Sequence, residues 1–261
     1  MSAALLLLAV FLFRSGLWAQ GNGNPPTFPP DSVVNSANGN PASLTPNVIA
    51  TLYGSDLAFS TEAADSNSQA LPTLLAGVRV IVGGIFASLL YVSPTQVNFI
   101  MPASLVPGQT GIYLHRDFLT TATVPITLLD AAPALFEDDS GIAAEHADGS
   151  LISADAPAHP DEVIVVYGTG LGRTNPTQID GTLPQSAARI ILFDQLRVLL
   201  DGQAVPVENI LYAGITPGFA GLYQINLRLP DEVGATPELR IALGDQMSQG
   251  ALRLQVAPAG P

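Results

Sequence analysis

One short motif occurs twice in this chain, and it restricts the fold more than any other feature. Its pattern is Gln-apolar-Asn-apolar-x-apolar-Pro, found at 96–102 and again at 224–230. A period of two places every second side chain on the same face of an extended strand. The apolar face is then formed by Val97, Phe99 and Met101 in the first copy and by Ile225, Leu227 and Leu229 in the second. The motif therefore predicts two equivalent β-strands, each with one buried face and one amide-bearing face.

Two further pairs of segments recur in the same order. "VIATLYGSDLA" (48–58) is similar to "VIVVYGTGLG" (163–172), and "VRVIVGG" (78–84) is similar to "LRVLLDG" (196–202). Tyr91 precedes its Gln by five residues whereas Tyr212 precedes its Gln by twelve, so the second copy carries a longer loop, "AGITPGFAG". Repeats in a conserved order predict a tandem duplication.

Copies of this length, about 100 to 128 residues, match the usual size of a β-sandwich domain. We therefore predict an all-β chain with two tandem immunoglobulin-like β-sandwich domains, at 33–130 and 131–258, with the boundary near Pro133. The segment 185–200 has the apolar content of a helix, but its counterpart in the first copy has a strand pattern, so strands are favoured. The other predicted strands are 48–53, 78–82, 86–91, 112–116, 121–128, 163–167, 198–200, 205–211, 239–243 and 252–256.

The first residues predict export. An apolar run at 3–13 precedes the small residues Gly16 and Ala19, which is typical of a signal peptide ending near residue 20. An uncleaved N-terminal anchor is the alternative. Residues 21–32 form a Gly/Asn/Pro linker, expected to be extended and mobile. Because the chain has no cysteine, it can contain neither disulfides nor a lipidated N-terminal cysteine. These features predict a secreted or cell-envelope protein of a bacterium.

The formal net charge of −13 excludes two classes of partner. Such a surface repels phosphate backbones and anionic lipids, so we expect no nucleic-acid binding and no membrane insertion once the leader is removed. The acidic side chains concentrate in 136–162, but their spacing matches no EF-hand, and a solvated loop is the favoured interpretation. Calcium binding by this acidic segment is the alternative; no other cofactor is predicted.

No catalytic motif is present in the sequence. Glycines 168, 170 and 172 follow a strand as GxGxG rather than GxGxxG, which favours a strand-ending turn over a nucleotide site. His115, His146 and His159 match no metal-ligand spacing, and no serine lies in a GxSxG elbow. We therefore predict a protein that is not an enzyme, with a hydrolase of unknown type as the less favoured alternative.

The repeated amides have two interpretations. Gln96 with Asn98, and Gln224 with Asn226, could brace loop backbone as structural amide pairs, which their presence in both copies favours. Alternatively, amides beside aromatic rings resemble a sugar-binding face. That alternative assigns ligand binding to three aromatics of the long second-copy loop, namely Tyr212, Phe219 and Tyr223.

Several stretches also carry a family resemblance: "VVNSANG" (33–39), "LLYVSPTQVNFIMP" (89–102), "HADGSLISADAPAHPDEVIVVYGTGLG" (146–172) and "LYAGITPGFAGLYQINLRLP" (211–230). Together they resemble the C-terminal domain family of uncharacterised secreted proteins of Solibacter and related Acidobacteria. Each half is also similar to IPT/TIG-type immunoglobulin-like domains. The resemblance implies extracellular placement and β-sandwich folds; it brings no established activity and no catalytic residues.

The sequence thus predicts an exported, non-catalytic module for adhesion, binding or spacing at the cell surface, whose partner is an unknown extracellular protein or glycan. A carbohydrate-binding module using the 212–223 loop is the alternative. If that loop packs between the halves instead, the binding hypothesis loses its main support and a spacer role gains.

Overall fold

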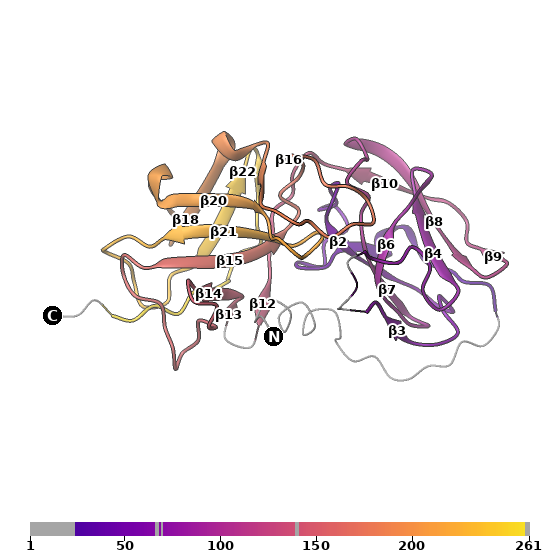
Figure 1. The fold of residues 1–261 in the computed structure, drawn as a ribbon, viewed down its shortest axis with the longest axis horizontal. Coiled ribbons are helices and arrows are strands. Elements are labelled where there is room, and N and C mark those ends of the chain that lie inside the picture. Colours follow the sequence, from indigo (N-terminus) through magenta and orange to yellow (C-terminus); the bar gives the residue numbers. More distant parts are fainter. Residues whose placement is uncertain (1–23, 66–67, 69, 139–140, 259–261) are drawn as a thin grey trace.

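The computed structural model describes residues 24–65, 68, 70–138 and 141–258, so the predicted signal peptide lies outside the described residues. The described chain contains β-strands and three 3-10 turns, at Pro30–Ser32, Phe193–Gln195 and Val207–Asn209, and no α-helix. It forms two lobes side by side, the N-terminal half in purple and the C-terminal half in orange and yellow (Figure 1). The all-β fold class is confirmed.

The first half is a sandwich of two antiparallel sheets. One sheet has the order β1 (Val33–Asn35), β2 (Ile49–Tyr53), β7 (Gln96–Ile100), β6 (Ser88–Val92) and β3 (Glu62–Ala63). The other has the order β10 (Val124–Leu128), β8 (Gly108–Arg116), β4 (Val78–Val82) and β5 (Ile85–Phe86), with β9 (Leu119–Thr120) paired to β8. Both sheets contribute side chains to one hydrophobic core, for example Phe99 from β7 and Ile112 from β8.

The second half repeats this plan with its own core. Its larger sheet has the order β11 (Ala134–Leu135), β15 (Val163–Thr169), β21 (Tyr223–Arg228), β20 (Ile210–Ile215), β17 (Ala188–Ile190) and β16 (Thr174–Asn175), with β14 (Ala144–His146) on β15. The smaller sheet has the order β19 (Gln203–Ala204), β18 (Leu196–Leu200), β22 (Leu239–Leu243) and β23 (Gln246–Met247). β12 (Glu137–Asp138) pairs antiparallel with β13 (Gly141–Ile142) in a separate two-stranded sheet.

The two motif copies occupy equivalent places. In each half the Gln and Asn lie on the central strand between two neighbours, opposite one Tyr on each side. The pairs are Gln96–Tyr53 and Asn98–Tyr91 in the first half, and Gln224–Tyr167 and Asn226–Tyr212 in the second. Both halves also shift register at the same point, between Leu89 and Tyr91 and between Ile210 and Tyr212. The sequence repeat is therefore a repeat of strand pairing as well.

Burial alternates along the second motif strand, β21, whereas in β7 the opposite face is buried too, at Asn98 and Ile100. All six predicted inward side chains are buried, with exposed fractions of 0 to 3%. The core of the first half ends at Leu128 and that of the second begins at Ala131. The strands predicted over 185–200 are also present, as β17 and β18.

Two predicted strands were wrong. Residues 205–211 form the 3-10 turn Val207–Asn209 and only then enter β20, because Pro206 precedes the turn and has no N–H to donate to a ladder. Residues 252–256 form no strand: their bridges, Glu238–Arg253 and Ala158–Val256, are isolated, although backbone hydrogen bonds such as Leu254 N–H to Pro237 O also hold the segment.

The described part of the linker lies against the first half. Thr27 pairs with Ser55, and Arg116, which is fully buried, donates to the carbonyl oxygens of Asn24 (2.6 Å) and Asp56. The guanidinium also stacks on Phe59, 4.0 Å from the ring centre. A buried cation needs such acceptors, so residues 24–29 pack against the first half, and the 3-10 turn Pro30–Ser32 follows them. No helix among the described residues reaches the length and apolar character needed to cross a bilayer.

Candidate functional site

The amide pairs are built alike in both halves. The side-chain amide of Gln96 donates to the Asn98 carbonyl oxygen, and that of Gln224 donates to Asn226, each at 2.9 Å. The bond runs along one strand, because residues two apart project from the same face. It fixes the orientation of both amides before any ligand arrives.

The tyrosine beside each pair has a different environment in the two halves. Tyr167 is 6% exposed, and its hydroxyl donates to Oε2 of Glu145 at 2.9 Å. Burial raises the pKa of Tyr167 and also that of Glu145, whose other carboxyl oxygen is buried without a partner. Tyr53, at the equivalent position, is 49% exposed. The tyrosine opposite the Gln is therefore covered in the second half and half exposed in the first, whereas Asn98 of the first half is 1% exposed.

The three aromatics of the long loop do not form an exposed face. Tyr223 is 0% exposed; its hydroxyl accepts from the Asn47 amide (3.0 Å) and donates to the Gly172 carbonyl, and burial raises its pKa. The Tyr212 hydroxyl lies within hydrogen-bonding distance of two backbone carbonyl oxygens, those of Ala188 (3.2 Å) and Ile215 (2.9 Å). Phe219 is partly buried against a cluster between the halves. The three aromatic side chains are therefore packed inside the protein and are not exposed to a ligand in solvent.

That cluster, here called the junction cluster, joins the two lobes. Its buried members are Ile49, Leu90 and Ile100 from the first half and Phe136, Ala143, Tyr167 and Leu222 from the second. Thr169 adds a polar tie, because its hydroxyl accepts from the Ile49 N–H (3.0 Å) and donates to the Gly221 carbonyl (2.8 Å). Apolar burial and satisfied hydrogen bonds occur together, as in a domain interior.

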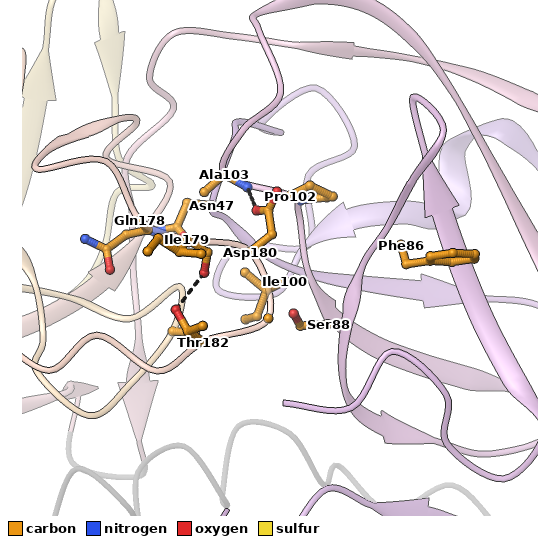
Figure 2. Close-up of a pocket in the computed structure, with 12 residues that line it drawn as sticks. Asn47, Phe86, Ser88, Ile100, Pro102, Ala103, Gln178, Ile179, Asp180 and Thr182 are labelled. Carbon is orange, nitrogen blue, oxygen red and sulfur yellow. Dashed lines mark hydrogen bonds between the residues drawn. The ribbon is translucent and has the colours of Figure 1, made fainter. Parts of the chain in front are cut away.

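A second tie crosses the junction at the loop before β17 (Figure 2). One carboxyl oxygen of Asp180 accepts from the Ala103 N–H at 2.6 Å, and the other accepts from the Ser104 hydroxyl. Leu71 donates its N–H to the Gly181 carbonyl at 3.1 Å in the same region. The cavity beside these contacts is about 10 Å³, which is at most the space of one water molecule. It is too small to bind a substrate or a sugar.

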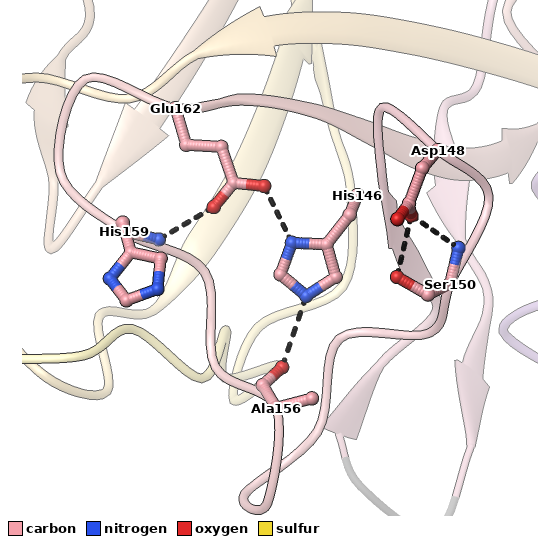
Figure 3. A network of polar contacts seen from close by, with 6 residues as sticks. All are labelled: His146, Asp148, Ser150, Ala156, His159 and Glu162. Carbon is pink, nitrogen blue, oxygen red and sulfur yellow. Dashed lines mark hydrogen bonds and ion pairs between the residues drawn. The ribbon is translucent and has the colours of Figure 1, made fainter.

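His146 is held in a polar network on the second half (Figure 3). Its Nδ1 lies 2.5 Å from Glu162 Oε1 and its Nε2 lies 3.2 Å from the Ala156 carbonyl oxygen. Burial lowers the His146 pKa, but the bonds to Glu162 and Ala156 and the nearby carboxylates outweigh it, so the pKa is raised. A carboxylate and a carbonyl oxygen both accept hydrogen bonds, so this pair of contacts favours the doubly protonated ring, in line with the raised pKa. It is a loop tether and has no free nitrogen to act as a base.

The acidic segment offers no metal site in its described part. Across residues 24–65, 68, 70–138 and 141–258, no three His, Asp or Glu side chains converge as metal ligands would. Asp148 instead accepts from the N–H and hydroxyl of Ser150, at 2.9 and 2.6 Å.

An open groove lies where the first-half motif meets the second half. We call it the junction groove; six of its lining residues are Ser36, Asn38, Tyr53, Gln96, Glu137 and Gln249. Its volume is about 420 Å³, within the range of small-ligand sites, about 300 to 1,000 Å³. Of the residues named from sequence, it contains Gln96 and none of the three loop aromatics.

The sequence analysis missed Tyr53, Glu137 and Gln249 as members of this groove. One signal was available for Tyr53: as the last residue of its strand pattern it faces away from the core, on the side of the amides. Glu137 and Gln249 arrive from the second half, and no sequence pattern places them there.

No protein-family model matches the chain, and no curated protein matches it. Among solved structures, it is similar to the surface glycan-binding protein SGBP-B of the Bacteroides ovatus mixed-linkage glucan utilization locus, at 13% identity and a TM-score of 0.32, over 91% of this chain and 46% of that one. It is similar to the surface glycan-binding protein PbSGBP-B of Prevotella bryantii at 12% identity and a TM-score of 0.28, over 88% of this chain and 42% of that one. It is also similar to the tandem Ig repeats of Dlar, at 12% identity and a TM-score of 0.20, over 82% of this chain and 91% of that one. The chain thus spans less than half the length of the first two.

Proposed function

We propose that this protein is an exported, non-catalytic β-sandwich module that holds two immunoglobulin-like lobes in a fixed arrangement outside the cell, for binding, adhesion or spacing. Membership of the family of secreted acidobacterial proteins belongs to the same proposal and rests on the resemblance of stretches such as 146–172 and 211–230. One observation supports the fixed arrangement of the two lobes: the junction combines a buried apolar cluster with hydrogen bonds from several separate segments.

The junction accounts for the long second-copy loop. Gly221 at its end lies so close to the first half that an added Cβ would be 2.8 Å from both Ile49 and Ile100. The longer second-copy loop therefore forms a contact between the lobes. Such a contact supports a rigid module rather than two lobes joined by a flexible linker.

The chemistry of the described residues supports a non-catalytic role. Both ring nitrogens of His146 lie at hydrogen-bond partners, the cavity beside Asp180 is too small for a substrate, and no three His, Asp or Glu side chains converge as metal ligands in the described ranges. A hydrolase would need a concave site with a nucleophile or paired carboxylates.

Rigidity can be measured directly, because the chain has no cysteine of its own. Spin labels would be attached through Phe118→Cys in the first half and Glu208→Cys in the second, both at exposed positions. Electron-electron double resonance should give one narrow distance distribution. Adding Asp180→Ala and Leu222→Ala should broaden it, whereas a broad distribution without them would contradict a fixed arrangement.

Export needs its own test. Fractionation of the native cells, with an antibody against the folded lobes, should find the protein in the envelope or the medium. Recovery from the cytosol alone would contradict the proposed location.

A further inference from the structure

We propose that the junction groove binds a neutral oligosaccharide, with Tyr53 as the stacking surface and Gln96 as the main hydrogen-bonding group. This inference rests on the proposed role as a binding module and names its ligand class.

The groove combines the two kinds of surface that a sugar ring needs. The Tyr53 ring is half exposed, and an aromatic face can pack against the apolar C–H face of a sugar. Directly across the strand pair lies Gln96, whose Nε2 is bonded to Asn98 and whose carbonyl oxygen points to no partner among the described residues. Sugar hydroxyls both donate and accept, which an amide can match.

The remaining polar groups are held in place before binding. The Ser36 and Thr51 hydroxyls lie 2.8 Å apart. The Gln249 side chain bonds both backbone groups of Leu135, at 3.1 and 2.5 Å, and reaches the Ala37 carbonyl of the other half at 3.5 Å. Groups already ordered cost little entropy when a ligand binds, so a small site can still be selective.

Charge decides which sugars fit. None of the residues that line the groove is Arg or His, and Glu137 contributes an exposed carboxylate on the wall from the second half. The whole chain carries a net charge of −13. Uronate or sulfated chains would be repelled, whereas Glu137 can accept hydrogen bonds from the hydroxyls of an uncharged sugar.

A peptide fits this groove less well. Peptides commonly bind by adding a strand to an unpaired sheet edge. The two strands that carry Tyr53 and Gln96, β2 and β7, are both interior in the order β1-β2-β7-β6-β3, so their backbone groups are already paired.

The test uses the full exported chain on an array of immobilised neutral oligosaccharides of hexoses and pentoses, with uronate oligosaccharides of equal length for comparison. We expect binding to at least one neutral set and none to the uronates. Tyr53→Ala should weaken binding at least tenfold, the change that about 1.4 kcal/mol represents, while Tyr53→Phe should retain most of it. Gln96→Ala should weaken binding, and Gln224→Ala, which removes the matching amide of the second half, should not.

Three outcomes would overturn the proposal. The folded chain could bind no neutral oligosaccharide, binding could survive both Tyr53→Ala and Gln96→Ala, or Gln224→Ala could weaken it as much as Gln96→Ala does. Capture of an immobilised peptide at the same residues, without any sugar binding, would also count against it. None of these results alters the spin-label distances, so the rigid arrangement is judged separately.

Discussion

At the scale of single residues, the junction depends on a few buried polar atoms with complete hydrogen bonding. The Tyr223 hydroxyl is the clearest case, because it joins Asn47 of the first half to the Gly172 carbonyl of the second. Its ring also fills the core of the second half. One side chain thus serves both packing and the contact between lobes.

Tyr223→Phe should therefore destabilise the protein. The substitution keeps the ring but leaves a buried amide N–H and a buried carbonyl without their partner, which costs about 1 to 3 kcal/mol. Urea unfolding should show the loss as a lower midpoint. Tyr53→Phe is the control, since that hydroxyl is on the half-exposed ring, and it should change the midpoint little; equal effects of the two would refute this account.

His146 should make stability depend on pH. Its folded pKa is raised above the unfolded value of 6.5, so its contribution is complete below pH 6.5 and is lost as the pH rises through the raised value. Unfolding free energies measured from pH 6 upward should decline. His146→Gln should flatten that decline.

Glu145 is a second titrating group and needs a separate control. Burial raises its pKa above 4.5, so its carboxyl also costs stability as the pH rises, but starting from the lower value of 4.5. Glu145→Gln should change the dependence of the unfolding free energy on pH at acid pH. If the decline near neutral pH disappears in this variant, that decline is due to Glu145 and not to His146.

At the scale of elements, strands were easier to predict than loops. A strand with one buried face is recognised by alternating apolar residues. The apolar pattern predicted the observed bounds of β4 and β22, and it predicted which side chains of the motif strands are buried. The segment at 205–211 has the same apolar pattern, yet Pro206 turns it out of the sheet. Composition alone could not show that the 212–223 loop is covered, because part of what covers it, Asn47, Ile49 and Ile100, comes from more than a hundred residues earlier.

The loop's contact with the first half can be isolated with two glycines. Gly221 and Gly218 both have positive φ, 74° and 85°, but an added Cβ meets Ile49 and Ile100 only at Gly221 and has open space at Gly218. Gly218→Ala should cost about 1 to 2 kcal/mol, the backbone strain alone. Gly221→Ala should cost a further 1 to 3 kcal/mol, as overpacking does.

Chemical unfolding of the two variants provides the comparison. Equal losses would mean that the loop is not tightly packed on the first half, and would remove one support for the rigid junction.

At the scale of the whole molecule, the two halves should unfold together. Each has its own core, but the junction cluster is buried only while both lobes are folded. Loss of one lobe would expose apolar side chains of the other and break the Asn47–Tyr223 and Asp180–Ala103 hydrogen bonds. Calorimetry should show a single transition for the unaltered chain.

Weakening the junction should separate the transitions. Asp180→Ala with Leu222→Ala removes one polar tie and one buried side chain without entering either main core, so two transitions are expected. Two transitions in the unaltered protein would instead show that the lobes are energetically independent.

The limits of the sequence also show at this scale. The repeat could be found in the sequence because equivalent strands need equivalent side-chain patterns. These patterns contain no information on how the two lobes contact each other. The groove is made by Tyr53 and Gln96 from one lobe with Glu137 and Gln249 from the other, and only the assembled molecule brings them together.

The different exposure of Tyr53 and Tyr167 predicts different patterns of natural variation at the two positions. We expect the two equivalent positions to be under different selection, because Tyr167 is buried and Tyr53 is half exposed. Among natural variants, changes at Tyr167 should be purged in every lineage that keeps the protein folded. The residue at position 53 should vary more among natural variants, and it should differ between organisms that encounter different extracellular ligands.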